Sequence, residues 1–233
     1  MTALQGWFVT GTDTEIGKTT ISAGLLHALG GRGLRVAGYK PVAAGTEWRD
    51  GRRINDDVER LRAAGNVPLS AEEACACLFD AACAPHLAAR ETGQTIALEA
   101  LRAGAQQLAS RVDRLVIEGV GGFCVPLDDH LDASELAVQL GLPVILVVGL
   151  RLGCLSHALL TAEAVRARGL RLAGWVGNEV DVHMDRREAN VDTLRSRLGR
   201  DFGAPCLGVV PRLKDPTAAA VATHLELPPL ERV

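Results

Sequence analysis

The sequence predicts an α/β protein in which residues 1–233 form a single doubly wound domain, a mainly parallel sheet flanked by helices. Strand-like apolar runs alternate with helix-like segments along the chain, with no linker, repeat or low-complexity tract. Some of these runs are continuously apolar, as in strands buried on both faces of a sheet: 115–117, 144–148 and 209–210. A glycine- and threonine-rich loop also joins the first strand to the first helix, at the edge where such sheets bind ligands.

Each expected strand is a short apolar run that ends at a glycine or a polar residue. In chain order the strands are 7–10, 35–39, 115–118, 144–149, 172–177 and 206–210. The expected helices carry apolar residues at helical spacing, as at Ile21 and Leu25, and Gly141 stands where a helix end favours glycine. They are 18–30, 55–64, 96–110, 133–140, 156–168 and 184–198. Two stretches without a clear pattern, 45–57 and 76–95, are expected to be active-site loops.

Composition and charge are those of a core-forming protein, with 48% hydrophobic residues, 23% charged residues and a net charge of −3. Because the charges are mixed and form no basic block, we expect no nucleic-acid partner. The longest strongly apolar run, 142–150, is much shorter than the roughly 20 residues of a membrane span, so we expect a buried strand and no membrane association. The six scattered cysteines lack paired spacing and no cationic leader precedes the first strand, which favours a cytoplasmic protein with reduced thiols.

The loop after the first strand has the pattern of a phosphate-binding loop. Residues 8–19 read Phe-Val-Thr-Gly-Thr-Asp-Thr-Glu-Ile-Gly-Lys-Thr, close to G-x-x-x-x-G-K-[ST] except that Thr12 stands in place of the first glycine. Backbone N–H groups of such a loop and of the following helix converge on phosphate oxygens. Lys18 can reach the β- and γ-phosphates, and the Thr19 hydroxyl can ligate Mg²⁺. We therefore expect a P-loop NTPase-like protein that uses a nucleoside triphosphate; the alternative is a helix cap with an ordinary surface lysine.

Polar residues follow several of the predicted strands, and the carboxyl ends of parallel strands meet at one edge of the sheet. Glu118 ends a buried run, where a lone carboxylate is costly, so it is expected to bind Mg²⁺ together with Thr19 or else to form a salt bridge. Asp56 and Asp57 begin a predicted helix, and the sequence does not decide between a second Mg²⁺ ligand and helix capping.

Two further residues lie at strand ends. Lys40 follows the second strand, where its ammonium would face an anionic substrate, although an exposed surface lysine is the alternative. Asn178 follows a buried strand, where its amide could bind an adenine edge or form a turn.

With these residues assembled, the chain resembles the dethiobiotin synthetases of biotin biosynthesis. The matching segments are 8–19, 37–42, 84–87, 116–122, 143–149, 152–158 and 173–178. The resemblance implies a ligase that uses ATP and Mg²⁺ to carboxylate 7,8-diaminononanoate with CO₂ derived from bicarbonate. Ring closure through a carbamate and a carbamic-phosphoric anhydride would give dethiobiotin, ADP and phosphate.

The resemblance also implies roles for individual positions. Thr19, Asp57 and Glu118 would bind Mg²⁺, and Lys18 and Lys40 would be the catalytic cations. The implied nucleotide contacts are Glu15, Ile16, Gly17, Lys18, Thr19, Thr20, Asp57, Glu118, Gly119, Val120, Gly121, Asn178, Glu179, Pro211, Arg212 and Leu213. The implied substrate contacts are Thr14, Lys40, Ala44, Gly153 and Cys154, the last two given by the partner chain of a homodimer whose substrate site lies near the interface.

The chain departs from the family pattern at several positions. Ala44 stands where the family usually has serine, and Thr46 or water is a candidate replacement for the lost hydroxyl. Residue 179 is glutamate rather than aspartate, and an acidic ribose contact expected after Leu213 is not evident. These departures concern substrate and ribose contacts, not the reaction class.

A nucleotide-switch ATPase of the partition or septum-positioning type is the rival interpretation, since those proteins share the fold. Their hallmark is a lysine five residues before the invariant lysine of the loop. Asp13 occupies that position here, which disfavours this alternative.

Overall fold

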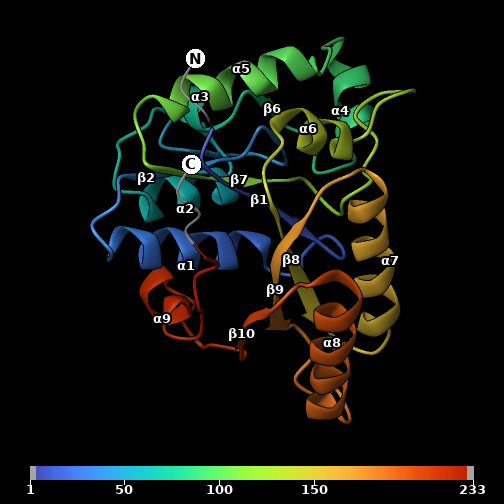
Figure 1. Cartoon of the computed structure of the whole chain (residues 1–233). Coiled ribbons are helices and arrows are strands. Elements are labelled where there is room, and N and C mark those ends of the chain that lie inside the picture. Colours follow the sequence, from blue (N-terminus) through green and yellow to red (C-terminus); the bar gives the residue numbers. More distant parts are fainter. Residues whose placement is uncertain (1–3, 230–233) are drawn as a thin grey trace.

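The computed structural model describes residues 4–229, and a six-stranded parallel sheet forms its centre (Figure 1). The strands are β1 (Gly6–Gly11), β2 (Val36–Tyr39), β7 (Arg114–Glu118), β8 (Val144–Leu150), β9 (Leu172–Glu179) and β10 (Cys206–Val210). They are arranged in the order β10-β9-β8-β1-β7-β2. The chain therefore builds outwards in both directions from β1, which lies among the central strands.

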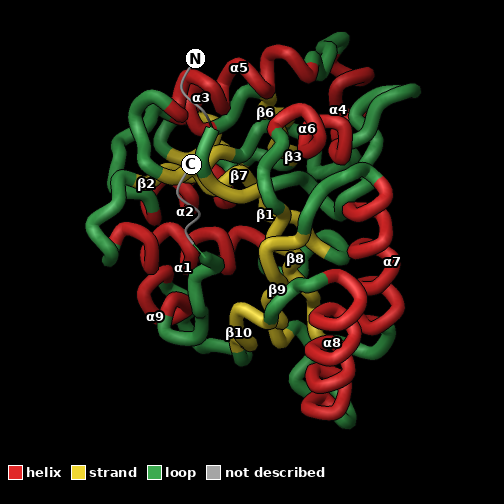
Figure 2. The backbone as a smooth tube through the Cα atoms, viewed as in Figure 1, coloured by secondary structure: helices red, strands yellow, loops and turns green. Residues whose placement is uncertain are grey.

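Helices cover both faces of this sheet (Figure 2). On one face α1 (Lys18–Gly30) packs against α9 (Ala218–Ala222) and α2 (Asp56–Ala64). The other face carries α5 (Leu98–Ala109), α6 (Ala133–Leu140), α7 (Cys154–Ala167) and α8 (Arg187–Phe202). The fold class predicted from the sequence, a mainly parallel sheet flanked by helices, is thereby confirmed.

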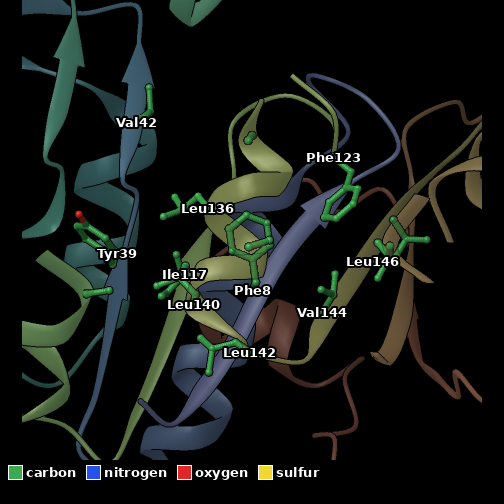
Figure 3. Packing of buried hydrophobic residues seen from close by; sticks show 14 of the residues in the cluster. Phe8, Tyr39, Val42, Ile117, Phe123, Leu136, Leu140, Leu142, Val144 and Leu146 are labelled. Atoms are coloured by element: carbon green, nitrogen blue, oxygen red, sulfur yellow. The ribbon is translucent and has the colours of Figure 1, made fainter. Parts of the chain in front are cut away.

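Alternating side chains of β1 supply the two halves of the core. Val9 is buried with Leu25 of α1, whereas its neighbour Phe8 is buried in the cluster on the opposite face of the sheet. In that cluster Phe8, Ile117 of β7 and Leu136 of α6 point towards one another (Figure 3). Burial of one such side chain stabilises a fold by about 1.5–3 kcal/mol, so these contacts fix the strand ends that carry the site.

The two stretches expected to be active-site loops contain regular structure, so the expectation that they are loops was wrong, although residues of both stretches line the cleft described below. Residues 45–57 hold the hairpin of β4 (Glu47–Arg49) and β5 (Arg52–Ile54), and 76–95 hold β6 (Cys77–Phe79) and α4 (Pro85–Thr92). β6 pairs with β3 (Val42–Ala44) in a separate two-stranded sheet. The hairpin strands are short and exposed and therefore have no apolar alternation, but the Asp50-Gly51 turn, with φ of 50° and 72°, is a recognisable hairpin signal.

Other differences from the predicted elements are small. Strand β9 extends through Asn178 and Glu179, so these two residues end the strand rather than follow it. Helix α7 begins at Cys154, and α8 runs from Arg187 to Phe202. The short helices α3 (Ala71–Ala74) and α9 were not predicted. No helix within residues 4–229 is long and apolar enough to cross a membrane.

Candidate nucleotide and substrate site

A cleft of about 720 Å³ opens where the loop after β1, the turn after β2 and the turn after β7 come together. Helix α2 and residues 82–85 complete its walls. The predicted site residues that line it are Thr14, Glu15, Gly17, Lys18, Thr19, Thr20, Lys40, Ala44, Asp57, Val120 and Gly121. The sheet order explains this convergence, because β1, β7 and β2 are neighbours and end at the same edge.

The phosphate-binding loop has the backbone of an anion cradle. Glu15 and Gly17 both have left-handed backbone angles, with φ of 58° and 87°, which turns successive N–H groups towards one side. Helix α1 begins directly afterwards, and no side chain caps its first turn, so those N–H groups remain available to a ligand. Between these two residues Ile16 is buried and anchors the loop. The local structure thus supports phosphate binding.

Thr12, which replaces the first glycine of the usual pattern, ties this loop to β8. Its hydroxyl accepts a hydrogen bond of 3.3 Å from the Gly149 N–H, and its own N–H donates to the Val147 carbonyl at 3.0 Å. Next to it, the Asp13 carboxylate pairs with Arg151, and the Asp13 carbonyl accepts the Lys18 ammonium at 2.8 Å. The departure from the glycine pattern therefore provides an additional anchor.

A buried charge cluster lies beside the loop. Glu118 is the last residue of β7, the strand between β1 and β2, so it lies between Thr19 and Lys40. Its Oε1 accepts the Lys40 ammonium at 2.6 Å and the Thr19 hydroxyl at 2.8 Å. The Lys40 ammonium also contacts Asp57 Oδ2 at 2.8 Å. Lys40 is only 4% exposed, so it is a cleft residue and not a surface lysine.

Two alternatives that the sequence left open can now be described in structural terms. The side chain that caps α2 is Asn55, which accepts a hydrogen bond of 3.2 Å from the Val58 N–H, whereas Asp57 faces Lys40. Glu118 does form the salt bridge considered as its alternative, but its second oxygen, Oε2, is buried and has no hydrogen-bond partner among residues 4–229. An unpartnered buried carboxylate oxygen is costly and marks a position that favours a cation.

Electrostatics in the cleft fix the protonation states of the two lysines differently. Burial lowers the pKa of Lys18 to about 8, and the attraction of Glu118 only partly opposes this. Burial also disfavours the charge on Lys40, but Glu118 and Asp57 outweigh it and hold the Lys40 pKa above its usual range. Burial raises the pKa of Asp57, yet Lys40 more than compensates and leaves that pKa below normal. Lys40 and Asp57 are therefore both charged at neutral pH.

The oxygen donors around this cluster fit a hard divalent cation. The Thr19 hydroxyl and the Asp57 and Glu118 carboxylates are the ligand types that Mg²⁺ prefers. Within residues 4–229 no three His, Cys, Asp or Glu side chains are grouped closely enough to hold a metal by themselves. A cation here would therefore need the hydroxyl and further oxygens from a phosphate ligand or water.

The residues expected to bind the base lie next to the phosphate loop rather than in the lining of the cleft. The Asn178 amide donates to the Ile16 carbonyl at 2.8 Å and packs so closely over Gly17 that a Cβ there would come within 2.2 Å of its nitrogen. The Glu179 carboxylate accepts the Arg212 N–H at 3.1 Å and pairs with Arg187. Glu179 thereby holds the segment 211–213 beside β9.

Two of the remaining predicted residues, Gly153 and Cys154, do not line the cleft of their own chain. Gly153, with φ of 96°, precedes α7, and Cys154 is buried at the start of that helix. Ala44, the position where the family usually has serine, does line the cleft. Thr46 does not replace the missing serine hydroxyl, because its own hydroxyl donates to Asp80 at 2.5 Å. That part of the expectation is not supported.

Sequence reasoning missed several cleft residues. Arg60 of α2 and Cys83, together with Val125, contribute to the walls. Cys83 directly precedes the segment 84–87, which carries part of the family resemblance, so proximity in sequence was an available signal. Arg60 had no such signal, since only the packing of α2 against α1 turns it towards the cleft.

Comparisons with known sequences show which family the chain belongs to. A family model described as an AAA domain matches residues 5–220. The ATP-dependent dethiobiotin synthetase BioD of Ralstonia nicotianae is 56% identical over 223 residues, which cover 96% of each chain.

Solved structures provide a comparison of the fold. A chain of the MinC:MinD cell division protein complex of Aquifex aeolicus has a TM-score of 0.56 and 16% identity, covering 98% of this chain and 99% of that one. A ParA family ATPase from Chlorobium tepidum has a TM-score of 0.56 and 13% identity, covering 95% and 92%. At such identities the likeness shows a shared fold and not a shared activity. The much closer sequence relative shows that this chain belongs to the family of ATP-dependent dethiobiotin synthetases.

Proposed function

We propose that the protein is a ligase that makes dethiobiotin from 7,8-diaminononanoate, CO₂ and ATP. The observation that carries the proposal is the buried cluster of Lys40, Glu118, Asp57 and Thr19 beside an anion-binding loop, since it combines a cation and oxygen ligands where a triphosphate would lie. The 56% identity to an ATP-dependent dethiobiotin synthetase supports the same reaction. A cytoplasmic location is part of the proposal, because the reaction consumes ATP.

The proposed reaction has three steps. One substrate amine adds to CO₂, forming a C–N bond and releasing a proton to give a carbamate. A carbamate oxygen then attacks the γ-phosphorus of ATP and displaces ADP, which gives a carbamic-phosphoric anhydride. The second amine attacks the carbonyl carbon and forms the second C–N bond. The bond between that carbon and the phosphate oxygen breaks, phosphate leaves with the electron pair, and loss of a proton from the amine completes the cyclic urea.

Most of the catalytic work in this scheme is positioning and charge stabilisation. The second step brings two anions together, so positive charge must already be in place. Lys18 lies at the phosphate loop, and Lys40 is kept protonated by Glu118 and Asp57. Both lysines are held by hydrogen bonds before any ligand arrives, which limits the reorganisation needed during the reaction.

Mg²⁺ is part of the proposal, with Thr19, Asp57 and Glu118 as its ligands. When bound, it would supply positive charge against the β- and γ-phosphates. The unpartnered Glu118 Oε2 supports this assignment. Lys40 already contacts Glu118 Oε1 and Asp57 Oδ2, so the ammonium and a metal ion would share the same two carboxylates.

The substrate and the dimer are assigned as follows. Thr14, Lys40 and Ala44 would face the diamine, since all three line the cleft. Gly153 and Cys154 would bind the substrate carboxylate from the partner subunit of a homodimer, because the uncapped start of α7 suits an anion. Adjacent to them, Leu152 is 90% exposed, as expected for a residue that a partner covers.

The test is phosphate release from MgATP and bicarbonate, with and without 7,8-diaminononanoate. The proposal predicts turnover only with the diamine, together with one ¹³C from labelled bicarbonate in the dethiobiotin product. A protein carrying Lys40→Met is the control for contaminating ATPases. ATP hydrolysis that does not depend on the diamine would contradict the proposal and favour a nucleotide switch.

The structure gives that alternative no specific support. Asp13 stands where switch ATPases have their hallmark lysine, and its carboxylate is paired with Arg151. The similarity to the MinD and ParA structures found is limited to the fold, at 13–20% identity.

A further inference from the structure

Arg60 bridges two walls of the cleft that belong to distant parts of the chain. Its Nη2 donates to the Thr20 hydroxyl at 3.2 Å and to the Pro216 carbonyl at 3.3 Å. Thr20 is in the first turn of α1, and Pro216 belongs to the segment that follows β10. Arg60 is exposed, and it is one of the residues that line the cleft.

The charge of this guanidinium is not matched within the described part of the chain. Both of its acceptors are neutral, and no carboxylate of residues 4–229 forms an ion pair with it. Lys40, by comparison, is paired with both Glu118 and Asp57. Arginine has five N–H donors in a planar fork, and its preferred partners are the oxygens of phosphates and carboxylates. Only Nη2 is used here, so the remaining donors suit an anionic ligand.

The position of Arg60 narrows the choice of ligand atoms. Lys18 and Thr19 lie on the side of the loop that receives the β- and γ-phosphates. The segment 211–213 is the proposed base-binding wall, and Pro216 lies just beyond it. The α-phosphate and ribose connect the terminal phosphates to the base, so they must pass between Thr20 and Pro216, where Arg60 lies.

We infer that Arg60 is a nucleotide-contacting residue whose guanidinium binds the α-phosphate of ATP. This inference rests on the proposed function only in taking ATP as the ligand. It adds a third cation to the cleft, besides Lys18 and Lys40. Its contribution is to the affinity for nucleotide and not to the chemical steps, because Lys18 and Lys40 already provide the charge at the reacting phosphate.

The first measurement is calorimetric titration of MgATP and MgADP, without the diamine, into the wild type, Arg60→Ala and Arg60→Lys. Loss of a charge-assisted hydrogen bond at an exposed position should weaken both nucleotides equally in Arg60→Ala, by about tenfold, with Arg60→Lys between the two. Arg195→Ala is the matched control, since Arg195 is an exposed helix arginine bonded to Asp192 outside the cleft. It should bind like the wild type.

Steady-state kinetics and nucleotide analogues separate a direct contact from a structural role. In Arg60→Ala the KM for ATP should rise about tenfold while kcat and the KM for the diamine stay within about twofold of wild type. The preference between the Rp and Sp diastereomers of ATPαS should also change, because the substituted sulfur is on the α-phosphorus. A midpoint of thermal unfolding equal to that of wild type would show that Arg60→Ala has not lost structure in general.

Two results would overturn the inference. Nucleotide binding by Arg60→Ala within twofold of wild type would show that the guanidinium is not a contact. If the effect of the substitution instead disappears with 2′-deoxy-ATP, the contact is to the ribose, and the assignment to the α-phosphate is wrong. Because these titrations do not require carboxylation, their outcome is independent of whether the diamine assay succeeds.

Discussion

Lys40 Nζ lies 2.6 Å from Glu118 Oε1, and this ion pair is almost completely removed from water. Glu118 ends β7 and Lys40 follows β2, so two adjacent parallel strands bring together residues that are 78 positions apart. The pair therefore depends on the sheet and in turn stabilises its carboxyl edge. Removal of one partner leaves a buried charge without compensation, whereas removal of both charges does not.

A double-mutant cycle at this pair should separate its effects on stability and activity. Lys40→Met should lower the free energy of unfolding by about 3–5 kcal/mol at pH 7, because it leaves Glu118 buried and unpaired. Adding Glu118→Gln should restore much of that stability, since the charge is then gone. Neither protein should retain turnover above about 1% of wild type. Urea unfolding and phosphate release measure the two quantities, and a double variant no more stable than Lys40→Met would contradict the argument.

The stability of the nucleotide-free protein should depend on pH through Lys18. Its pKa is lowered to about 8 by burial, whereas that of an unfolded lysine is about 10.4. Between these two values the unfolded state binds more protons, so the Lys18 contribution makes stability rise with pH in that window. Below pH 8 Lys18 is protonated in both the folded and the unfolded protein, and burial of its charge lowers the free energy of unfolding by about 3 kcal/mol.

The comparison of Lys18→Met with wild type isolates this contribution. The variant should be more stable than wild type at pH 7, and the difference should shrink as the pH rises from about 8 to about 10.4. Urea unfolding at several pH values without nucleotide provides the measurement. A stability difference that does not change with pH would show that Lys18 is well solvated.

Glu15 offers a test of backbone strain in the phosphate loop. At its φ of 58° a Cβ is unfavourable, and glycine avoids that cost. The free energy of unfolding of Glu15→Gly should therefore exceed that of Glu15→Ala by about 1 kcal/mol. At most positions the glycine variant is instead the less stable of the two. Since both substitutions remove the side chain, chemical denaturation of the two variants compares the backbone alone. The opposite order would mean that the loop relaxes to an ordinary conformation.

Cys83 should make the protein sensitive to alkylation. The residue is exposed and lines the cleft, so a maleimide attached to it would occupy the space next to Lys40 and Ala44. We expect N-ethylmaleimide to abolish most activity, and Cys83→Ser to remain active and resistant. Cys124, which is exposed but does not line the cleft, provides the control in Cys124→Ser. If Cys83→Ser and Cys124→Ser protected the activity against N-ethylmaleimide equally well, Cys83 would not be the thiol responsible for the sensitivity.

The strands and the phosphate loop could be predicted because their signals are local. A continuous apolar run identifies a buried parallel strand, and the Gly17-Lys18-Thr19 triplet identifies the loop without any knowledge of the rest of the chain. The convergence of Lys40 and Glu118 followed from one additional rule, that parallel strands end at the same edge. The structure confirms the fold, and the roles of individual residues remain predictions.

The rest depended on tertiary contacts that have no local signature. Whether Thr46 could replace a hydroxyl at Ala44 was decided by Asp80, a partner 34 positions away. Arg60 reaches the cleft because α2 packs against α1, which the helical pattern of α2 does not specify. The hairpin at 47–54 was missed for a different reason, since its exposed strands lack the apolar alternation that usually identifies them.

The bond from the Asn178 amide to the Ile16 carbonyl has a kinetic consequence. Together with the buried Ile16 side chain, it sets the loop in its binding shape before ATP arrives. Since the loop already has this shape, capture of the nucleotide requires little rearrangement of it and should proceed at a rate typical of preformed sites. The lifetime of the complex, rather than its rate of formation, is then what substitutions around the loop would change.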